Sequence, residues 1–99
     1  MTTENIREFK VLAEKRNYIA AAQALQTSQA SLSRHIMAME NELGFRLLER
    51  NTRNVELTLY GLRFLHYARE AVQILEACDA AFAGPLPRHE DAADGAVSE

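Results

Sequence analysis

Residues 27 to 36 read TSQASLSRHI and gather short hydrogen-bonding side chains around one arginine. Their hydroxyls can donate and accept, the amide of Gln29 does both, and the guanidinium of Arg34 offers several donors in a fixed plane. Glutamine pairs bidentately with adenine and arginine with guanine, while serine adapts to either kind of base edge. The stretch is therefore suited to recognising bases and phosphates.

Catalytic and metal chemistry have no comparable motif in this sequence. His35, His66 and His89 have no metal-ligand spacing with one another or with Cys78. No Ser-His-Asp or Cys-His arrangement is suggested by the local context. We therefore expect no enzyme activity, no cofactor and no bound metal.

Three short helices with polar breaks are predicted to position this stretch. The first runs over residues 4–15 with Thr3 as N-cap, and the second, alanine-rich, over 18–26 with Asn17 as N-cap. Ser28 caps a third helix that ends at Gly44. That helix carries an inward apolar stripe at spacings of four, three and four: Leu32, Ile36, Met39 and Leu43.

A different pattern follows the third helix. Short extended segments are expected at 45–49 and 55–57, and the polar turn between them predicts a small hairpin. Thr58 can cap a long last helix that reaches about Phe82 and is stopped by Gly84-Pro85. The acidic remainder is expected to be disordered. We divide the chain into a domain over 1–57, a long helix over 58–83 and a tail over 84–99.

The second and third helices with their tight turn form a helix-turn-helix candidate. In such a motif the second helix lies in the DNA major groove with its N-terminal residues at the base edges. Leu32 and Ile36 would face the domain, while the other side would face the groove with Gln29, Ala30, Ser33 and Arg34. The helix N-terminus and the hydroxyls of Thr27 and Ser28 can bind a phosphate.

A longer run, FKVLAEKRNYIAAAQALQTSQASLSRHIMAMENELGFRLLERNTRNVELTLYG, resembles the N-terminal winged helix-turn-helix of LysR-type transcriptional regulators. The resemblance extends from about residue 6 to residue 77. Its matches occur in order: Ala21-Ala22, Leu25, Ser28-Gln29, Leu32-Ser33-Arg34, Ile36, Glu40, Leu43-Gly44, Leu47, Leu48, Arg50, Leu57-Thr58 and Gly61. It implies a mainly α fold with a three-helix core, a two-stranded wing and a long dimerisation helix.

Several positions depart from the family pattern. Ala30 stands where a proline is usual, Thr27 where a valine is common, and Leu59-Tyr60 where a small or proline-containing pair is usual. These changes affect the base preference more than the fold. Family members continue into a small-molecule-binding domain, and no effector site is carried over to this chain.

Two arginines flank the predicted wing. The resemblance favours Arg53 for a phosphate or minor-groove contact, where narrow A·T-rich segments concentrate negative potential. Arg50 can serve the same surface or brace the wing against the third helix. The alternative for both is a solvated turn.

The last helix has more apolar surface than one domain can cover. Its apolar residues span an arc of roughly 200°, about twice what packing on one domain requires. Part of the arc can pack on the first helix, and the rest fits a second copy of the chain, paired antiparallel as the resemblance implies. The predicted dimerisation residues are Tyr60, Phe64, Tyr67, Ala71, Ile74 and Cys78.

The charge distribution permits an anionic partner although the net charge is −3. Residues 84–99 carry that entire charge, residues 1–83 are neutral, and no acidic residue occurs between Glu14 and Glu40. A single cysteine excludes an internal disulfide, and neither a signal peptide nor an apolar run long enough for a membrane span is visible. We therefore expect a cytoplasmic protein.

The sequence favours a homodimeric, sequence-specific reader of double-stranded DNA that occupies a pseudo-palindromic operator. An interaction protein that pairs with full-length relatives and modulates them is the alternative. A third reading is a truncated product of a normal regulator.

Overall fold

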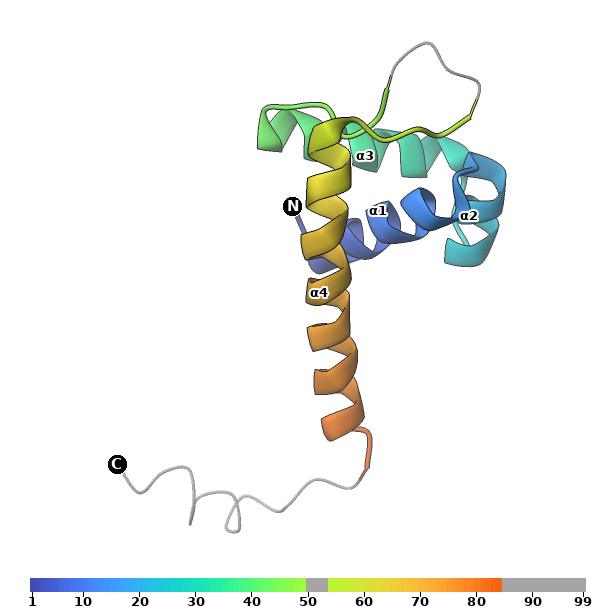
Figure 1. Ribbon diagram of the computed structural model, residues 1–99. Coiled ribbons are helices and arrows are strands. Elements are labelled where there is room, and N and C mark those ends of the chain that lie inside the picture. Colours follow the sequence, from blue (N-terminus) through green and yellow to red (C-terminus); the bar gives the residue numbers. More distant parts are fainter. Residues whose placement is uncertain (50–53, 85–99) are drawn as a thin grey trace.

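The computed structural model describes residues 1–49 and 54–84 of the chain (Figure 1). These residues form four helices and the segments that connect them. The helices are α1 (Thr3–Lys15), α2 (Tyr18–Leu25), α3 (Gln29–Leu43) and α4 (Leu59–Ala81). Helix α1 packs against the other three, and α2 also packs on α3. The predicted mainly α, winged helix-turn-helix fold is confirmed.

Each helix begins at a polar N-cap, although the first cap is one residue earlier than predicted. Thr2 rather than Thr3 caps α1, because its hydroxyl accepts from the amide of Asn5 while the Asn5 side chain accepts from the amide of Thr2. This reciprocal capping box satisfies two backbone donors at once. Asn17 and Ser28 cap α2 and α3 as predicted.

The breaks between α1, α2 and α3 are tight because two residues adopt left-handed backbone conformations. Arg16 has a φ of 56° and Gln26 a φ of 57°. The amide of Arg16 returns to the carbonyl of Leu12 at 2.8 Å, which closes the end of α1. Helix α2 ends at Leu25, one residue before the predicted end, because Gln26 has left the helical region.

The core lies where α1, α2, α3 and the first half of α4 meet. Its largest fully buried side chains come from α1, α3 and the segment before the wing: Phe9, Leu12, Leu32, Ile36, Met39 and Leu47. Three of the four residues of the predicted α3 stripe are buried, and Leu43 is half-buried. Buried Ala21 and Ala22 bring the backbone of α2 close to its neighbours.

The predicted hairpin is reduced to its base in the described residues. Only a single antiparallel bridge, between Leu48 and Leu57, connects the two segments there. Full strands over 45–49 and 55–57 are not formed, and this part of the prediction was wrong. One reason is that the amide of Leu47 donates to the buried Glu40 carboxylate at 2.8 Å and so is not available to the carbonyl of Thr58 opposite it. The amide of Leu48 donates to the same carboxylate at 3.1 Å.

Helix α4 begins after Thr58 as predicted and ends at Ala81, one residue before the predicted end. Its first half packs on α1, and its second half extends beyond the three-helix domain (Figure 1). Arg69 donates to Glu14 of α1 at 3.2 Å and so adds a polar contact to this packing. In the described part of the chain, no helix has the length and apolarity to cross a membrane.

Candidate nucleic-acid interface

The predicted groove residues lie at the start of α3, on the side away from the core. Gln29, Ala30 and Arg34 are exposed, and Ser33 is half-buried. Leu32 and Ile36, on the opposite side, have exposed fractions of 0% and 1%. The helix is therefore anchored by its apolar side and leaves the polar side chains of Gln29 and Arg34 toward solvent, with the small Ala30 beside them.

The N-terminus of α3 retains hydrogen-bonding capacity for an anion. The Ser28 hydroxyl oxygen accepts from the amide of Ser31 at 3.0 Å, which leaves its own O–H free to donate outward. The first amides of a helix have no partner within it and carry the positive end of the helix dipole. Thr27 is half-buried, and its amide donates to the carbonyl of Ala22 at 3.0 Å. This end of α3 can therefore bind a phosphate.

Arg34 is exposed and forms no ion pair with any acid in the described residues. One guanidinium nitrogen donates to the Ser31 hydroxyl at 3.2 Å. Glu40, an acidic residue of the same helix, is buried and accepts from the amide of Leu47 on the segment that leads to the wing. The remaining donors of Arg34 are therefore free to contact a base or a phosphate.

His35 is half-buried on α3, with 42% of its side chain exposed. Its Nδ1 atom is 3.0 Å from each carboxylate oxygen of Glu8 on α1. The Glu8 side chain is only 6% exposed and also accepts from the side-chain nitrogen Nδ2 of Asn5 at 3.1 Å. His35 thus connects α3 to α1. Nothing in the spacing of the sequence pairs these residues, because they lie 27 positions apart.

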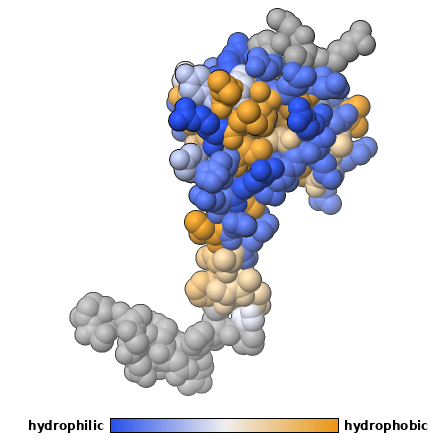
Figure 2. All heavy atoms as spheres, viewed as in Figure 1, coloured by the Kyte–Doolittle hydropathy of each residue, from blue (hydrophilic) through white to orange (hydrophobic). Residues whose placement is uncertain are grey.

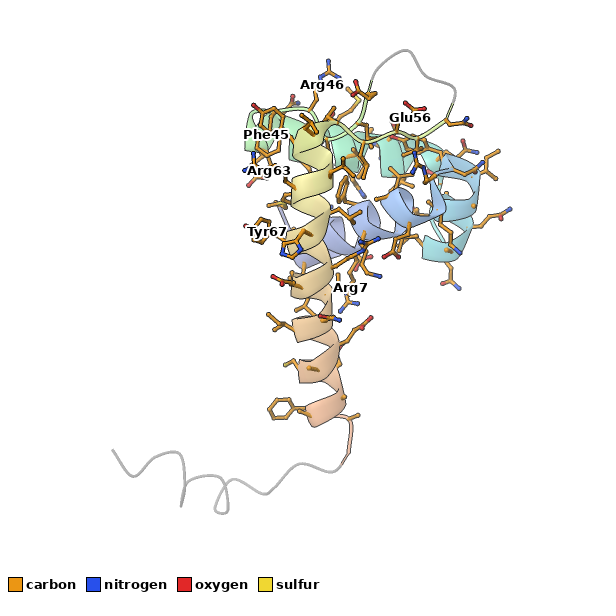
Figure 3. The ribbon with its side chains drawn as sticks, in the orientation of Figure 1. Arg7, Phe45, Arg46, Glu56, Arg63 and Tyr67 are labelled. Carbon is orange, nitrogen blue, oxygen red and sulfur yellow. The ribbon has the colours of Figure 1, made fainter. Side chains whose placement is uncertain are left out.

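The base of the wing is positioned by Thr58 as well as by Glu40. The Thr58 hydroxyl donates to the carbonyl of Arg46 at 2.6 Å and accepts from the amide of Gly61 at 2.9 Å. The exposed Arg46 side chain extends outward beside the wing (Figure 3). The sequence analysis did not select Arg46 as a candidate contact residue. Its position two residues after Gly44, between α3 and the wing, could have indicated it. Arg50 and Arg53 lie outside the described residues.

A second exposed surface runs along α4. The predicted dimerisation residues recur at spacings of four and three, which is the pattern of a helix-pairing seam. Tyr60, Tyr67 and Ile74 are 55%, 66% and 69% exposed, and Cys78 is also exposed. Ala71 is half-buried. In Figure 3, Arg63 and Tyr67 extend from the side of α4 opposite α2. We define the α4 seam as Tyr60, Phe64, Tyr67, Ala71, Ile74 and Cys78.

The α4 seam borders the face that packs on the domain. Leu65, Ala68 and Val72 are buried on that face. Phe64 lies at the boundary, because its ring meets Phe9 of α1 edge-on with centroids 5.4 Å apart. The second half of α4 carries apolar surface beyond the domain (Figure 2). The division of the apolar arc into an inner part on α1 and an outer part agrees with the sequence analysis.

No group of three or more metal-ligating side chains occurs within residues 1–49 and 54–84. The two surface features of the described residues that could bind a partner are the polar N-terminal part of α3 and the exposed apolar residues of α4.

Comparison with known proteins agrees with this geometry. Residues 3–62 match the family described as bacterial regulatory helix-turn-helix protein, lysR family. A probable hydrogen peroxide-inducible genes activator of Mycobacterium xenopi is 41% identical over 83 residues, which are 84% of this chain and 44% of that protein. The SDS degradation transcriptional activation protein of Pseudomonas sp. (strain ATCC 19151) is 48% identical over 64 residues, covering 65% of this chain and 21% of that one. The chain therefore spans less than half the length of these curated relatives.

Two solved structures extend the similarity to three dimensions. The BenM_DBD chain in its complex with benA site 1 DNA matches 82% of this chain and 91% of its own, with a TM-score of 0.78 and 33% identity. An H2O2-bound OxyR mutant of Corynebacterium glutamicum matches 84% of this chain and 27% of its own, with a TM-score of 0.80 and 35% identity.

Proposed function

Since the chain belongs to the lysR family of bacterial regulatory helix-turn-helix proteins, we propose that it binds a pseudo-palindromic DNA operator as a homodimer and thereby regulates transcription. Its fold is that of a DNA-binding regulator of this family. One observation carries the proposal: α3 presents Gln29, Ala30 and Arg34 to solvent, while Leu32 and Ile36 anchor its opposite side. The exposed side chains of Gln29 and Arg34 are available to bases and phosphates, and this supports the proposal within a family of DNA-binding regulators.

In the proposed complex, α3 lies in the major groove with its N-terminal turns at the base edges. Arg34 and Gln29 supply bidentate donors and acceptors for guanine and adenine, and Ser33 adapts to the neighbouring base. Ser28 and the first amides of α3 hold a backbone phosphate, which fixes the register of the helix. Thr27 is proposed to contact the same phosphate.

The wing is proposed to contact the DNA backbone beside the major groove. Arg53, and Arg50 with it, would enter or border the minor groove, where narrow segments attract arginine. The support is local: Glu40 and Thr58 hold the base of the wing on the same side of the molecule as the exposed Arg46. Because these contacts neutralise phosphates, affinity should fall steeply as salt concentration rises.

Pairing through the α4 seam is proposed to place two copies of α3 on two half-sites about one helical turn apart. The exposed Tyr67 and Ile74 support this step, since such residues on a projecting helix are covered readily by another helix. The same seam supports the rival function, in which the chain pairs with full-length relatives and modulates them. The exposed Gln29, Ala30 and Arg34 of α3 favour direct DNA reading, because a protein that acts only by pairing has no use for base-contacting residues.

The test is selection of random duplex DNA by the purified chain and by its Arg34→Ala variant. Enrichment of an inverted repeat by the parent chain is expected, with affinity about ten- to hundredfold lower in the variant. Arg88→Ala is the matched control, because it removes the same charge outside α3 and the α4 seam and should retain the selected sequence. If the folded, dimeric parent chain enriches no sequence, direct reading is refuted and the pairing function becomes the better account.

A further inference from the structure

One exposed residue on α3 has no role in the account so far. Met37 is 47% exposed and is the only large hydrophobic side chain of α3 among the exposed ones of the described residues. Its neighbours in the outward row of α3, Arg34 and Asn41, are polar, although the hollow on its wing side is also lined by Leu48 and Val55. Met37 does not belong to the hydrophobic core, so its side chain is available to an apolar group of a partner that contacts this face.

The position of Met37 relates it directly to the groove residues. At 100° per residue, it falls on one outward row with Ala30, Arg34 and Asn41, at spacings of four, three and four. All four residues of this row are exposed. Met37 also lines a shallow hollow of about 180 Å³ beside the wing, together with Ser33 and Arg46. A duplex contacted by both Arg34 and the wing would therefore pass over Met37.

The distance along α3 is compatible with the same contact surface. The helix rises about 1.5 Å per residue, so Met37 stands about 4.5 Å beyond Arg34 along its axis. That length is little more than one base-pair step of about 3.4 Å. The major groove is about 12 Å wide and admits a helix over several residues. Met37 thus faces a base pair next to, or one removed from, the pair that Arg34 contacts.

Among the bases, thymine alone presents a methyl group to the major groove, and apolar side chains recognise it by contact. Methionine suits this task because its unbranched, polarisable side chain adapts to an irregular apolar surface. Resting on the proposed function, we propose that Met37 determines specificity by packing on the C5-methyl group of a thymine in each half-site. Ala30, in the same row, supplies a second and smaller apolar contact.

The experiment removes the methyl group alone. Each thymine of the selected operator is replaced in turn by deoxyuridine, and the affinity of the full chain is measured by fluorescence anisotropy at fixed salt. Loss of one buried methyl contact should weaken binding about fourfold for one half-site. The loss is expected at a thymine one or two base pairs from the guanine that Arg34→Ala identifies. Met37→Ala should bind the thymine and uracil forms of that site equally.

The matched control is Leu62→Ala, which shortens a side chain of similar exposure on α4 and should keep the uracil penalty. Circular dichroism and thermal unfolding establish that each variant is folded. If the parent chain reads an operator but tolerates uracil at every position, the role of Met37 is refuted while the proposed function stands. Persistence of the same penalty in Met37→Ala has the same consequence. If no duplex is bound at all, the proposed function and this inference fall together.

Discussion

The Nδ1 atom of His35 on α3 lies 3.0 Å from both carboxylate oxygens of Glu8 on α1. The two residues connect α3 to α1, on the flank of α3 away from Ser33 and the wing. Glu8 is buried, and in the described residues only His35 and Asn5 contact its carboxylate through hydrogen bonds. The contact therefore adds a polar link between α1 and α3 to the apolar packing of Leu32 and Ile36.

Replacement of His35 by alanine should lower the free energy of unfolding by about 1–2 kcal/mol, because a buried carboxylate loses its main partner. Urea denaturation of the parent, His35→Ala, Glu8→Ala and the double variant measures this coupling. We expect the double variant to be less destabilised than the sum of the single ones. Additive effects would mean that the two side chains do not stabilise each other.

Gly61→Ala should destabilise the chain by about 2–3 kcal/mol, because an added Cβ would stand 2.1 Å from the carbonyl oxygen of Leu47 and force the wing base off α4. Thermal unfolding monitored by circular dichroism measures the effect. Gly84→Ala is the control, since nothing lies within 4 Å of its Cβ position and it should change the midpoint little. Equal midpoints for the two variants would contradict the close approach of α4 and Leu47.

Glu40→Ala should cost about 2–3 kcal/mol, because the amides of Leu47 and Leu48 lose the acceptor that they share. Glu40→Gln keeps one carbonyl acceptor and should retain a larger part of the stability. Hydrogen exchange of the two amides reports the loss at the site itself. Unchanged protection of both amides in Glu40→Ala would show that another group satisfies them.

The stability of the chain should decrease in acid partly through Glu14. Burial raises the pKa of this carboxyl, but hydrogen bonds and charge from Lys10 and Arg69 outweigh burial and leave the pKa below its ordinary value of 4.5. Because the unfolded state then binds the proton more readily, this contribution is present above about pH 4.5 and is lost as pH falls through the lower folded value. Urea denaturation between pH 6 and pH 3 should show a shallower decline for Glu14→Gln. Parallel curves for parent and variant would contradict the shift.

Ile74→Asp should convert the proposed dimer to a monomer, because a charge in the α4 seam must lose its hydration when two helices pair. Sedimentation velocity over a range of concentrations measures the change. Leu62→Asp introduces the same charge on another exposed face of α4 and should leave the dimer intact. A dimer that survives Ile74→Asp but dissociates with Leu62→Asp would move the interface to that other face.

The local elements were predictable because their signals are local. Asn17, Ser28 and Thr58 begin helices where their hydroxyl or amide groups can accept a backbone hydrogen bond within three residues. Helical periodicity predicts the inward stripe containing Leu32 and Ile36, and it also predicts that Arg34 lies on the side of α3 away from the core. The start of α1 was missed by one residue because two threonines, Thr2 and Thr3, compete to cap it.

The sequence by itself determined the order of the helices, the outward position of Gln29, Ala30 and Arg34 on α3, and the wide apolar arc of α4. The reason is that spacing along the chain specifies which residues share a face of a helix. Tertiary structure alone decided what crosses between elements. The sequence does not show that His35 contacts Glu8 of α1, or that Glu40 accepts from the amide of Leu47 at the base of the wing. The hydrogen bond to Glu40 also removes the Leu47 amide from the predicted hairpin. Partners distant along the chain compete for a donor or acceptor only once folding brings them within hydrogen-bond distance, and no local pattern records that competition.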